Sequence, residues 1–472
     1  MRGGRVGAGV LAAVVLVAGC GGSGGGEGDD QDGSPKEKQP AVKAAKLSVP
    51  SEFRPAQGWD ESLPWIPGSV HSIPVAATDD GRVAVMQVAS DGYTVKVRDA
   101  ADGAVRWSSA PWKVPTPVEG AEGSDASGEP AELPGLVSAT IGGAPHIVAW
   151  AHGTRGSDEL NKGTEILRLA VFPAKATGRS VEPLREIDVP VSAMPGDYQI
   201  NGGEDGSLLV AWGDRDMYPS STAAVDLTDG KIAVHRDPDN LLPQCARQTM
   251  CSGSRVIDVH DGSVLVAMGS GGFGVPGRWS SGDFRPRGVP AVTGFLNSPN
   301  GAVYGAGAGR LLAAWHPVPS SGAEADPVWS VHDQGTGELL ASMSCDADVP
   351  EKKDGDRDYA VGSSPDGRFL FAGPVAFDLE RKKGLCLVGD GNPKTVLLAS
   401  ADERGIAYGA VEDTADSEAP TLVRLDLTTP TGSPEVLPAG TELPLITDLK
   451  GSGLFVTRDA NENILVSLRR RS

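Results

Sequence analysis

The chain has 472 residues, with 62 Asp and Glu side chains against 42 Lys and Arg, so its formal net charge is −20. Such an acidic body repels nucleic acids and anionic polymers, which argues against nucleic-acid binding and favours a protein, a neutral or cationic small molecule, or a cation as its partner. The 63 glycines, 36 prolines and 22% charged residues favour many turns and little long helix. Short apolar runs bounded by turn residues recur along the chain, and they predict an all-β protein.

Residues 1–19 are typical of a secretory signal peptide. Arg2 and Arg5 form a basic start, and the apolar segment over residues 6–18 is too short to span a bilayer as a helix. The following Val17-Ala18-Gly19-Cys20 resembles the lipobox of bacterial lipoproteins. This resemblance implies cleavage before Cys20, a diacylglyceryl group on its thiol, and a location at the outer face of the bacterial plasma membrane. The alternative is an ordinary secreted protein with an incidental cysteine near the cleavage site.

Residues 20–46 are predicted to be a flexible linker. They are mostly Gly, Ser, Asp, Glu, Lys, Pro and Gln, with almost no bulky apolar side chain to offset the entropy of ordering. As a flexible coil, the linker would span about 28 Å r.m.s.. Loss of Arg2 and Arg5 with the signal peptide changes the net charge from −20 to −22. Residues 47–472 remain for the folded domain.

The folded domain repeats a pattern of short apolar strand, Asp-Gly-like turn and second apolar strand. Two-residue hairpins prefer turn pairs of this kind. In the hairpin that begins at Phe295, the expected turn is Asn300-Gly301. Eight such hairpins begin at Ile73, Leu136, Tyr198, Val256, Phe295, Tyr359, Val396 and Leu445.

A second pattern places an aspartate four residues before a glycine between two strands, so that the carboxylate bonds the turn amides and the glycine supplies positive φ. It occurs at Asp99, Asp226 and Asp333, with looser copies at Asp378 and Asp426.

Two hairpins per unit would make a four-stranded antiparallel blade, and radial repetition of blades makes a β-propeller. The segment Val97–Trp107 resembles the repeats of quinoprotein-like propellers, and the Ser364–Gly367 turn is similar to those of WD-repeat and TolB-type propellers. Eight hairpins favour eight blades, with seven as the alternative. A strand from within residues 47–70 is expected to join the C-terminal strands in the last blade and to close the ring.

With Cys20 assigned to the lipid anchor, four cysteines remain outside the reducing cytosol, where disulfides are expected. Three pairings are open, and proximity in sequence favours Cys245–Cys251 with Cys345–Cys386. A zinc site or a catalytic thiol is the weaker alternative, because no C-x-x-C or paired histidine has metal-ligand spacing.

The other candidates for chemistry are weak. Asp354, Asp356 and Asp358 have a spacing that can present carboxylates to calcium, but the glycine and distal glutamate of an EF-hand loop are absent, so a solvated loop is favoured. Trp59, Trp65, Trp112 and Trp315 either line a binding face or, as is commoner, pack between blades.

Two further groups are expected at the surface. The terminal Arg469-Arg470-Arg471 is predicted to be a solvated end. The seven histidines are predicted to lie at the surface or in turns: His71, His146, His152, His235, His260, His316 and His332.

No catalytic residue and no cofactor are predicted. The sequence thus favours a cell-envelope lipoprotein whose propeller is a non-catalytic binding or scaffolding module, with another envelope protein or a small ligand as its partner. The quinoprotein resemblance implies the alternative, a dehydrogenase that binds pyrroloquinoline quinone in the axial pocket. Against it, only Val97–Trp107 approximates the Trp-containing repeat in full, and no two cysteines are adjacent.

Overall fold

The computed structural model describes residues 44–67, 73–117, 133–158, 160–192, 198–203, 205–214, 218–236, 241, 255–268, 272–289, 301–315, 326–347, 361–389, 394–412, 420–429, 433–459 and 461–472. All of them belong to one compact unit, Ala41–Ser472. Cys20, the signal segment, Cys245, Cys251 and the three aspartates of the calcium candidate lie outside the described residues.

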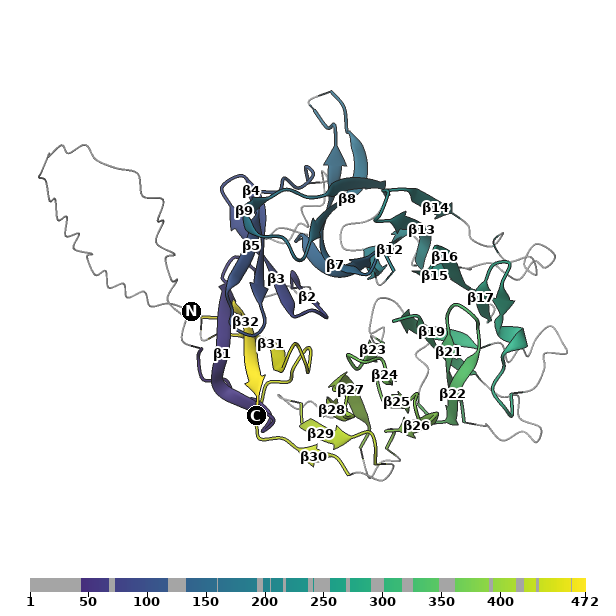
Figure 1. Cartoon of the computed structure of the whole chain (residues 1–472). Helices are drawn as coiled ribbons and strands as arrows, with labels where there is room; N and C mark the ends of the chain where they lie inside the picture. Colours follow the sequence, from purple (N-terminus) through teal and green to yellow (C-terminus); the bar gives the residue numbers. More distant parts are fainter. Residues whose placement is uncertain are drawn as a thin grey trace, which may run out of the picture. The chain divides into compact units, whose positions relative to one another are not determined.

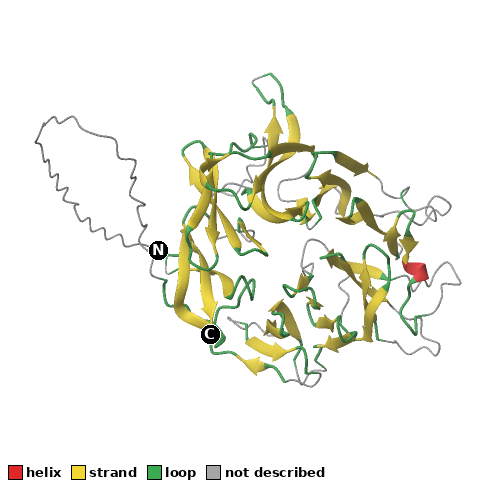
Figure 2. Ribbon diagram, viewed as in Figure 1, coloured by secondary structure: helices red, strands yellow, loops and turns green. Residues whose placement is uncertain are grey.

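Eight sheets are arranged in a ring as a β-propeller (Figure 1), which confirms the predicted fold and the favoured number of blades. Figure 2 shows strands throughout, and the described residues include one short 3-10 helix, η3 (Ser281–Asp283). Blade 1 consists of β2 (Val75–Thr78), β3 (Arg82–Ala89), β4 (Gly92–Asp99) and β5 (Val105–Ser109). Blade 2 consists of β6 (Gly135–Ile141), β7 (Ala144–Arg155), β8 (Thr164–Pro173) and β10 (Arg185–Pro190). Blade 3 consists of β11 (Tyr198–Gly202), β12 (Ser207–Asp214), β13 (Tyr218–Asp226) and β14 (Ile232–Arg236).

The remaining blades follow the same order from the inner to the outer strand. Blades 4 and 5 consist of β15 (Arg255–His260), β16 (Ser263–Ala267), β17 (Phe273–Val275) and β18 (Trp279–Ser280), and of β19 (Ala302–Gly307), β20 (Arg310–Trp315), β21 (Val328–Asp333) and β22 (Leu339–Ser344). Blades 6 and 7 consist of β23 (Gly362–Ser363), β24 (Phe369–Ala372), β25 (Val375–Asp378) and β26 (Lys383–Cys386), and of β27 (Val396–Ala401), β28 (Ile406–Val411), β29 (Leu422–Asp426) and β30 (Glu435–Val436). In blade 1, β9 (Gly178–Val181) pairs in parallel with β5 as a fifth strand.

Blade 8 closes the ring with both ends of the chain. The N-terminal β1 (Phe53–Leu63) pairs with the C-terminal β32 (Ile464–Arg471), which pairs with β31 (Ser452–Arg458). The innermost strand is reduced to a bridge between Ile446 and Leu454. The predicted closure by a strand from residues 47–70 is therefore confirmed. It pairs residues about 400 positions apart and leaves no open edge between the first and last blades.

Seven of the eight predicted hairpins form the inner two strands of one blade each, and the hairpin predicted from Phe295 was wrong. There, the innermost strand is β19, and its turn is Ala308-Gly309, with φ values of 52° and 65°. Gly301 serves packing instead, since a Cβ on it would lie 2.7 Å from the Trp315 ring. The sequence alone does not distinguish an Asn-Gly pair that forms a turn from one whose glycine leaves space for the aromatic ring of another residue.

The core is a series of apolar layers between adjacent blades. One cluster joins Trp107 of blade 1 to Phe172 of blade 2, whose rings lie 5.7 Å apart. Each strand pair is covered on both sides by neighbouring blades, so both of its faces need apolar side chains. This is why the sequence shows short, nearly continuous apolar runs and no long helical pattern.

Tryptophans from outer strands dock onto the next blade along the ring. The indole N–H of Trp59 in β1 donates to Ala100 O (3.2 Å), and that of Trp279 in β18 donates to Gln334 O (3.1 Å). Each acceptor directly follows the aspartate of an Asp-x-x-x-Gly turn. Gly103 ends the first of these turns with φ 71°, and a Cβ there would lie 2.5 Å from the Trp59 ring. The glycine is therefore needed both for the turn and for the docked indole.

Candidate functional site

The two faces of the ring are built differently. In an antiparallel meander, the first and third turns lie at one end of the sheet, and the second turn and the link to the next blade lie at the other. The first and third turns are mostly short, as at Gly142-Gly143 and Asp261-Gly262. We call the face that carries them the tight-turn face. Turns of adjacent blades meet on it, since Arg381 Nη1 donates to Thr428 O at 3.1 Å.

The polar groups of the tight-turn face are largely used within the fold. Asp99 Oδ1 accepts a hydrogen bond from Ala101 N at 3.0 Å, as the Asp-x-x-x-Gly pattern predicts. Asp333 likewise accepts from Thr336 N and also pairs with Arg310 at 2.6 Å. An arginine at the start of the second strand, opposite the aspartate that ends the third, is a pairing that the sequence patterns did not reveal. These charges stabilise turns and are not free for a ligand.

The longer connecting segments of the chain begin and end at the opposite face, which we call the long-connection face. Six of them contain 20 acidic and seven basic residues in total. Connecting segments on a rigid scaffold are where binding residues are commonly found. These six segments are residues 110–134, 237–254, 281–301, 316–327, 345–361 and 412–421.

The disulfide between Cys345 and Cys386, predicted from the sequence, is present, with 5.5 Å between the two Cα atoms. Cys345 directly follows β22, and Cys386 ends β26, so the bond joins the outer strands of blades 5 and 6 at the long-connection face. It fixes the start of the segment that carries Asp354, Asp356 and Asp358.

Three histidines predicted to be at the surface are buried, so that prediction was wrong for them. His332 is fully buried, and His146 and His152 are 8% and 9% exposed. The pKa of His332 falls from its usual value to about 4, because burial disfavours its charged form, although the hydrogen bond to Gly337 O opposes this shift. Ser330 Oγ lies 2.9 Å from His332 Nε2, but both side chains are completely buried and no carboxylate orients the ring. This pair is therefore structural.

The predicted tryptophans lie in the core rather than on a binding face. Trp59, Trp112 and Trp315 are at most 5% exposed. The partly buried Trp65 donates its indole N–H to Met86 O at 3.2 Å, which ties the end of β1 to blade 1. The preference for packing between blades is thus confirmed.

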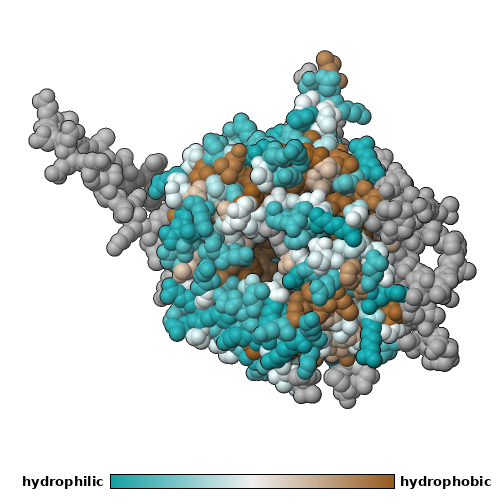
Figure 3. Space-filling view, turned by 45° about the vertical axis from the view of Figure 1, so that its right-hand side comes forward, coloured by the Kyte–Doolittle hydropathy of each residue, from teal (hydrophilic) through white to brown (hydrophobic). Residues whose placement is uncertain are grey.

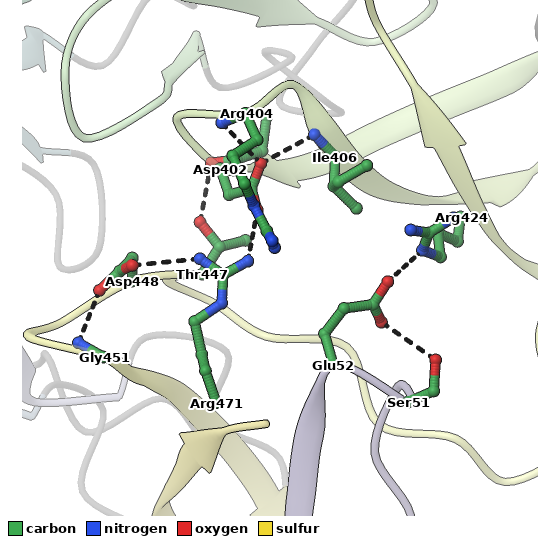
Figure 4. Close-up of polar contacts among 11 residues, drawn as sticks. Ser51, Glu52, Asp402, Arg404, Ile406, Arg424, Thr447, Asp448, Gly451 and Arg471 are labelled. Atoms are coloured by element: carbon green, nitrogen blue, oxygen red, sulfur yellow. Dashed lines mark hydrogen bonds and ion pairs between the residues drawn. The ribbon is translucent and has the colours of Figure 1, made fainter.

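The prediction that the terminal arginines form a solvated end was wrong for Arg469 and Arg471 and is confirmed only for Arg470, which is exposed. Arg469 is completely buried, pairs with Asp60 at 2.7 Å, and donates to Ala45 O at 2.9 Å. In Figure 4, Arg471 extends between Asp402 and Asp448, and its Nη1 lies 3.1 Å from Asp448 Oδ2. Arg469 and Arg471 point to the same face of β32, which is covered by other parts of the ring, whereas Arg470 points to the opposite face and is exposed.

Asp402 is the centre of this charged cluster at the junction of blades 7 and 8 (Figure 4). Its side chain is completely buried and pairs with Arg404 Nη2 at 3.0 Å as well as with Arg471. Burial would raise the pKa of the Asp402 carboxyl, but hydrogen bonds from Arg471, Ile406 N and Arg404 hold it below its usual range. The cluster seals the ring and offers no free group to a substrate.

A separate cavity of about 300 Å³ lies beside the outer strand of blade 6 on the tight-turn side. Its rim carries Arg381, Lys382 and Lys383, a basic run that the sequence analysis did not single out. Three consecutive basic residues are unusual in a chain with net charge −20, and this was the sequence signal that could have pointed to the cavity rim.

Figure 3 shows a recess near the middle of the face in view, with hydrophobic residues within it. Within the described ranges, no three His, Cys, Asp or Glu side chains are placed to hold a metal ion. No helix in the described part of the chain is long and apolar enough to cross a membrane.

No protein-family model and no curated protein sequence matches this chain. Solved structures similar to it include the β-propeller domain of the Trilobed protease from Pyrococcus furiosus, at 10% identity and a TM-score of 0.34 over 84% of this chain and 93% of that chain. The WD40 domain of Toxoplasma gondii coronin is similar at 9% identity and a TM-score of 0.34, over 90% and 88% of the two chains. The polysaccharide lyase Uly1 is similar at 10% identity and a TM-score of 0.36, over 91% and 98%. With TM-scores below 0.5, these similarities support no conclusion about function.

Proposed function

We propose that this chain is a bacterial lipoprotein, anchored through Cys20 at the outer face of the plasma membrane, and that its β-propeller is a binding or scaffolding module. The observation that carries the proposal is the difference between the two faces. On the tight-turn face, aspartates and arginines pair with each other and with turn amides. On the long-connection face, six extended segments begin and end around one ring. A rigid ring that presents such segments is suited to hold a partner.

The charge of the six segments indicates the chemistry of the partner. Their 20 acidic and seven basic residues account for much of the net negative charge of the chain. Segments with this net charge attract a basic or neutral polar partner and repel nucleic acid and anionic polymers. We therefore expect another envelope protein with a basic surface, or a small cationic or neutral ligand.

Site-specific photo-crosslinking in cells tests the binding face. A photoreactive residue at Leu160, which is 93% exposed at the tip of the β7–β8 hairpin on the long-connection face, is expected to give a discrete adduct with the partner. The matched control is Asp79, an exposed residue of the β2–β3 turn on the tight-turn face, which is expected to give none. Equal adducts from both positions, or an adduct from Asp79 alone, would contradict the assignment of the face.

The anchor is tested by a Cys20→Ala variant. The two acyl chains of a diacylglyceryl group hold a protein firmly, whereas a single chain binds marginally. The wild-type chain is therefore expected in the membrane fraction, even after a wash with high salt, and the variant in the soluble extracytoplasmic fraction when its signal is still cleaved. Absence of a lipid-modified N-terminal peptide from the wild-type protein in mass spectrometry would refute the anchor independently of fractionation.

A further inference from the structure

The cavity beside blade 6 combines an apolar wall with a basic rim. Met343 comes from blade 5, Phe377 and Leu385 from blade 6, and Leu427 from blade 7. Its volume of about 300 Å³ lies at the lower end of the range for small-molecule sites. Arg381, Lys382 and Lys383 lie at the turn between β25 and β26, where the cavity opens to solvent.

Blades 5 and 6 carry smaller residues at the outer-strand position where blade 1 carries an indole. In blade 1, Trp107 stands opposite Val97 and docks onto the next blade. In blade 5, the residue opposite Val331 is Ala341, and in blade 6 the residue opposite Ala376 is Leu385. The outer strands of blades 5 and 6 therefore both lack the tryptophan that blade 1 has at this position.

The free charges of the cavity are positive. No hydrogen-bond or ion-pair partner of Lys382 or Lys383 is present in the described part of the chain, and both side chains are exposed. The carboxylate that lines the cavity, Asp378, is engaged by Arg368 Nη2 at 2.8 Å. Hydrogen bonds from Arg368 hold the pKa of Asp378 below its usual range, although burial opposes this shift, and the charge of the carboxylate is compensated locally.

We propose that this cavity binds a small amphipathic anion, a phosphate monoester or a carboxylate with a short apolar chain. The acid group would lie against Lys382 and Lys383, and the chain against Leu385 and Leu427, which pack on the same side of blade 6. A buried apolar contact and a pair of ammonium groups together define this ligand class. An anionic membrane surface is disfavoured as the occupant, because the whole chain carries a net charge of −20.

Isothermal titration calorimetry with hexyl phosphate on residues 41–472, which include all eight blades, tests the proposal. Saturable binding is expected, and inorganic phosphate and 1-hexanol, which each supply half of the ligand, are expected to bind at least tenfold more weakly. Equal binding of inorganic phosphate would show an ion site without the apolar component and would overturn the proposal. Cosedimentation with phosphatidylglycerol vesicles that needs the same lysines would overturn it in favour of a membrane surface.

A Lys382→Gln/Lys383→Gln variant should raise the Kd for hexyl phosphate about tenfold, equivalent to about 1.4 kcal/mol. The matched control is Lys450→Gln: Lys450 is also an exposed lysine in a tight turn, with φ 54° against 53° for Lys382. The control is expected to bind as the wild type does, and both variants to keep the wild-type melting temperature. An unchanged Kd in the double variant, or an equal loss in the control, would refute the site. The test is independent of the lipid anchor.

Discussion

Burial decides the chemistry of individual residues in this propeller, and His332 shows how. Its Nδ1 lies 3.0 Å from Gly337 O, an acceptor, so this nitrogen carries the proton of the neutral ring. Its Nε2 therefore accepts a hydrogen bond from Ser330 Oγ, which in turn accepts from the Trp315 indole N–H at 2.7 Å. The site is satisfied by a neutral imidazole, and the positive charge of a doubly protonated ring would be buried beside Phe273 and Trp315 with no carboxylate from the described part of the chain to compensate it.

The lowered pKa of His332 makes stability depend on pH. The unfolded histidine takes up a proton below about pH 6.5, whereas the folded one does so only at about pH 4. Its contribution is therefore constant above pH 6.5 and is lost as the pH falls from there to about 4. Between pH 7 and pH 5 the loss amounts to about 2 kcal/mol. Urea unfolding at both pH values should show this component in the wild type and not in a His332→Gln variant. An identical pH dependence in the two proteins would contradict the burial argument.

At the scale of strands and turns, the sequence predicted what local interactions control. The Asp-x-x-x-Gly turns were recognisable because a carboxylate that bonds turn amides and a glycine at positive φ are both local requirements. The hairpin at Phe295 was misplaced because Asn300-Gly301 and Ala308-Gly309 are both dipeptides able to form a turn, and packing against Trp315 decides between them. The disulfide was predicted from proximity in sequence, and its two cysteines lie at the same ends of the outer strands of adjacent blades.

At the scale of the whole molecule, ring closure depends on contacts between the ends of the chain. Arg469 holds Asp60, and it also donates to Pro55 O at 3.1 Å and Ala45 O at 2.9 Å. These bonds tie the segment before β1 and β1 itself to β32. From the sequence, the folded domain was expected to begin at residue 47. Ala45, two residues before this boundary, already forms hydrogen bonds with Asp60 and Arg469.

An Arg469→Ala variant should lower the free energy of unfolding by about 3 kcal/mol or more, because it leaves the buried carboxylate of Asp60 without its cation. Arg470→Ala is the matched control: this neighbour is exposed, donates to Ala101 O at 3.0 Å, and should cost less than about 1 kcal/mol. Urea unfolding monitored by tryptophan fluorescence measures both. Equal losses in the two variants would show that Arg469 does not clamp the closure.

The sequence by itself determined the all-β class and the repeated hairpins, and it favoured eight blades and the Cys345–Cys386 disulfide, because these features depend on local turn chemistry and on spacing along the chain. Only the tertiary structure decided that Arg469 is buried, that His332 is neutral, and that a cavity with a basic rim lies beside blade 6. Arg469 meets Asp60 across 409 positions, and the cavity is lined by residues that three different blades contribute, such as Met343, Leu385 and Leu427. Such pairings follow from closing the ring and stacking its blades, and no local pattern in the chain encodes them.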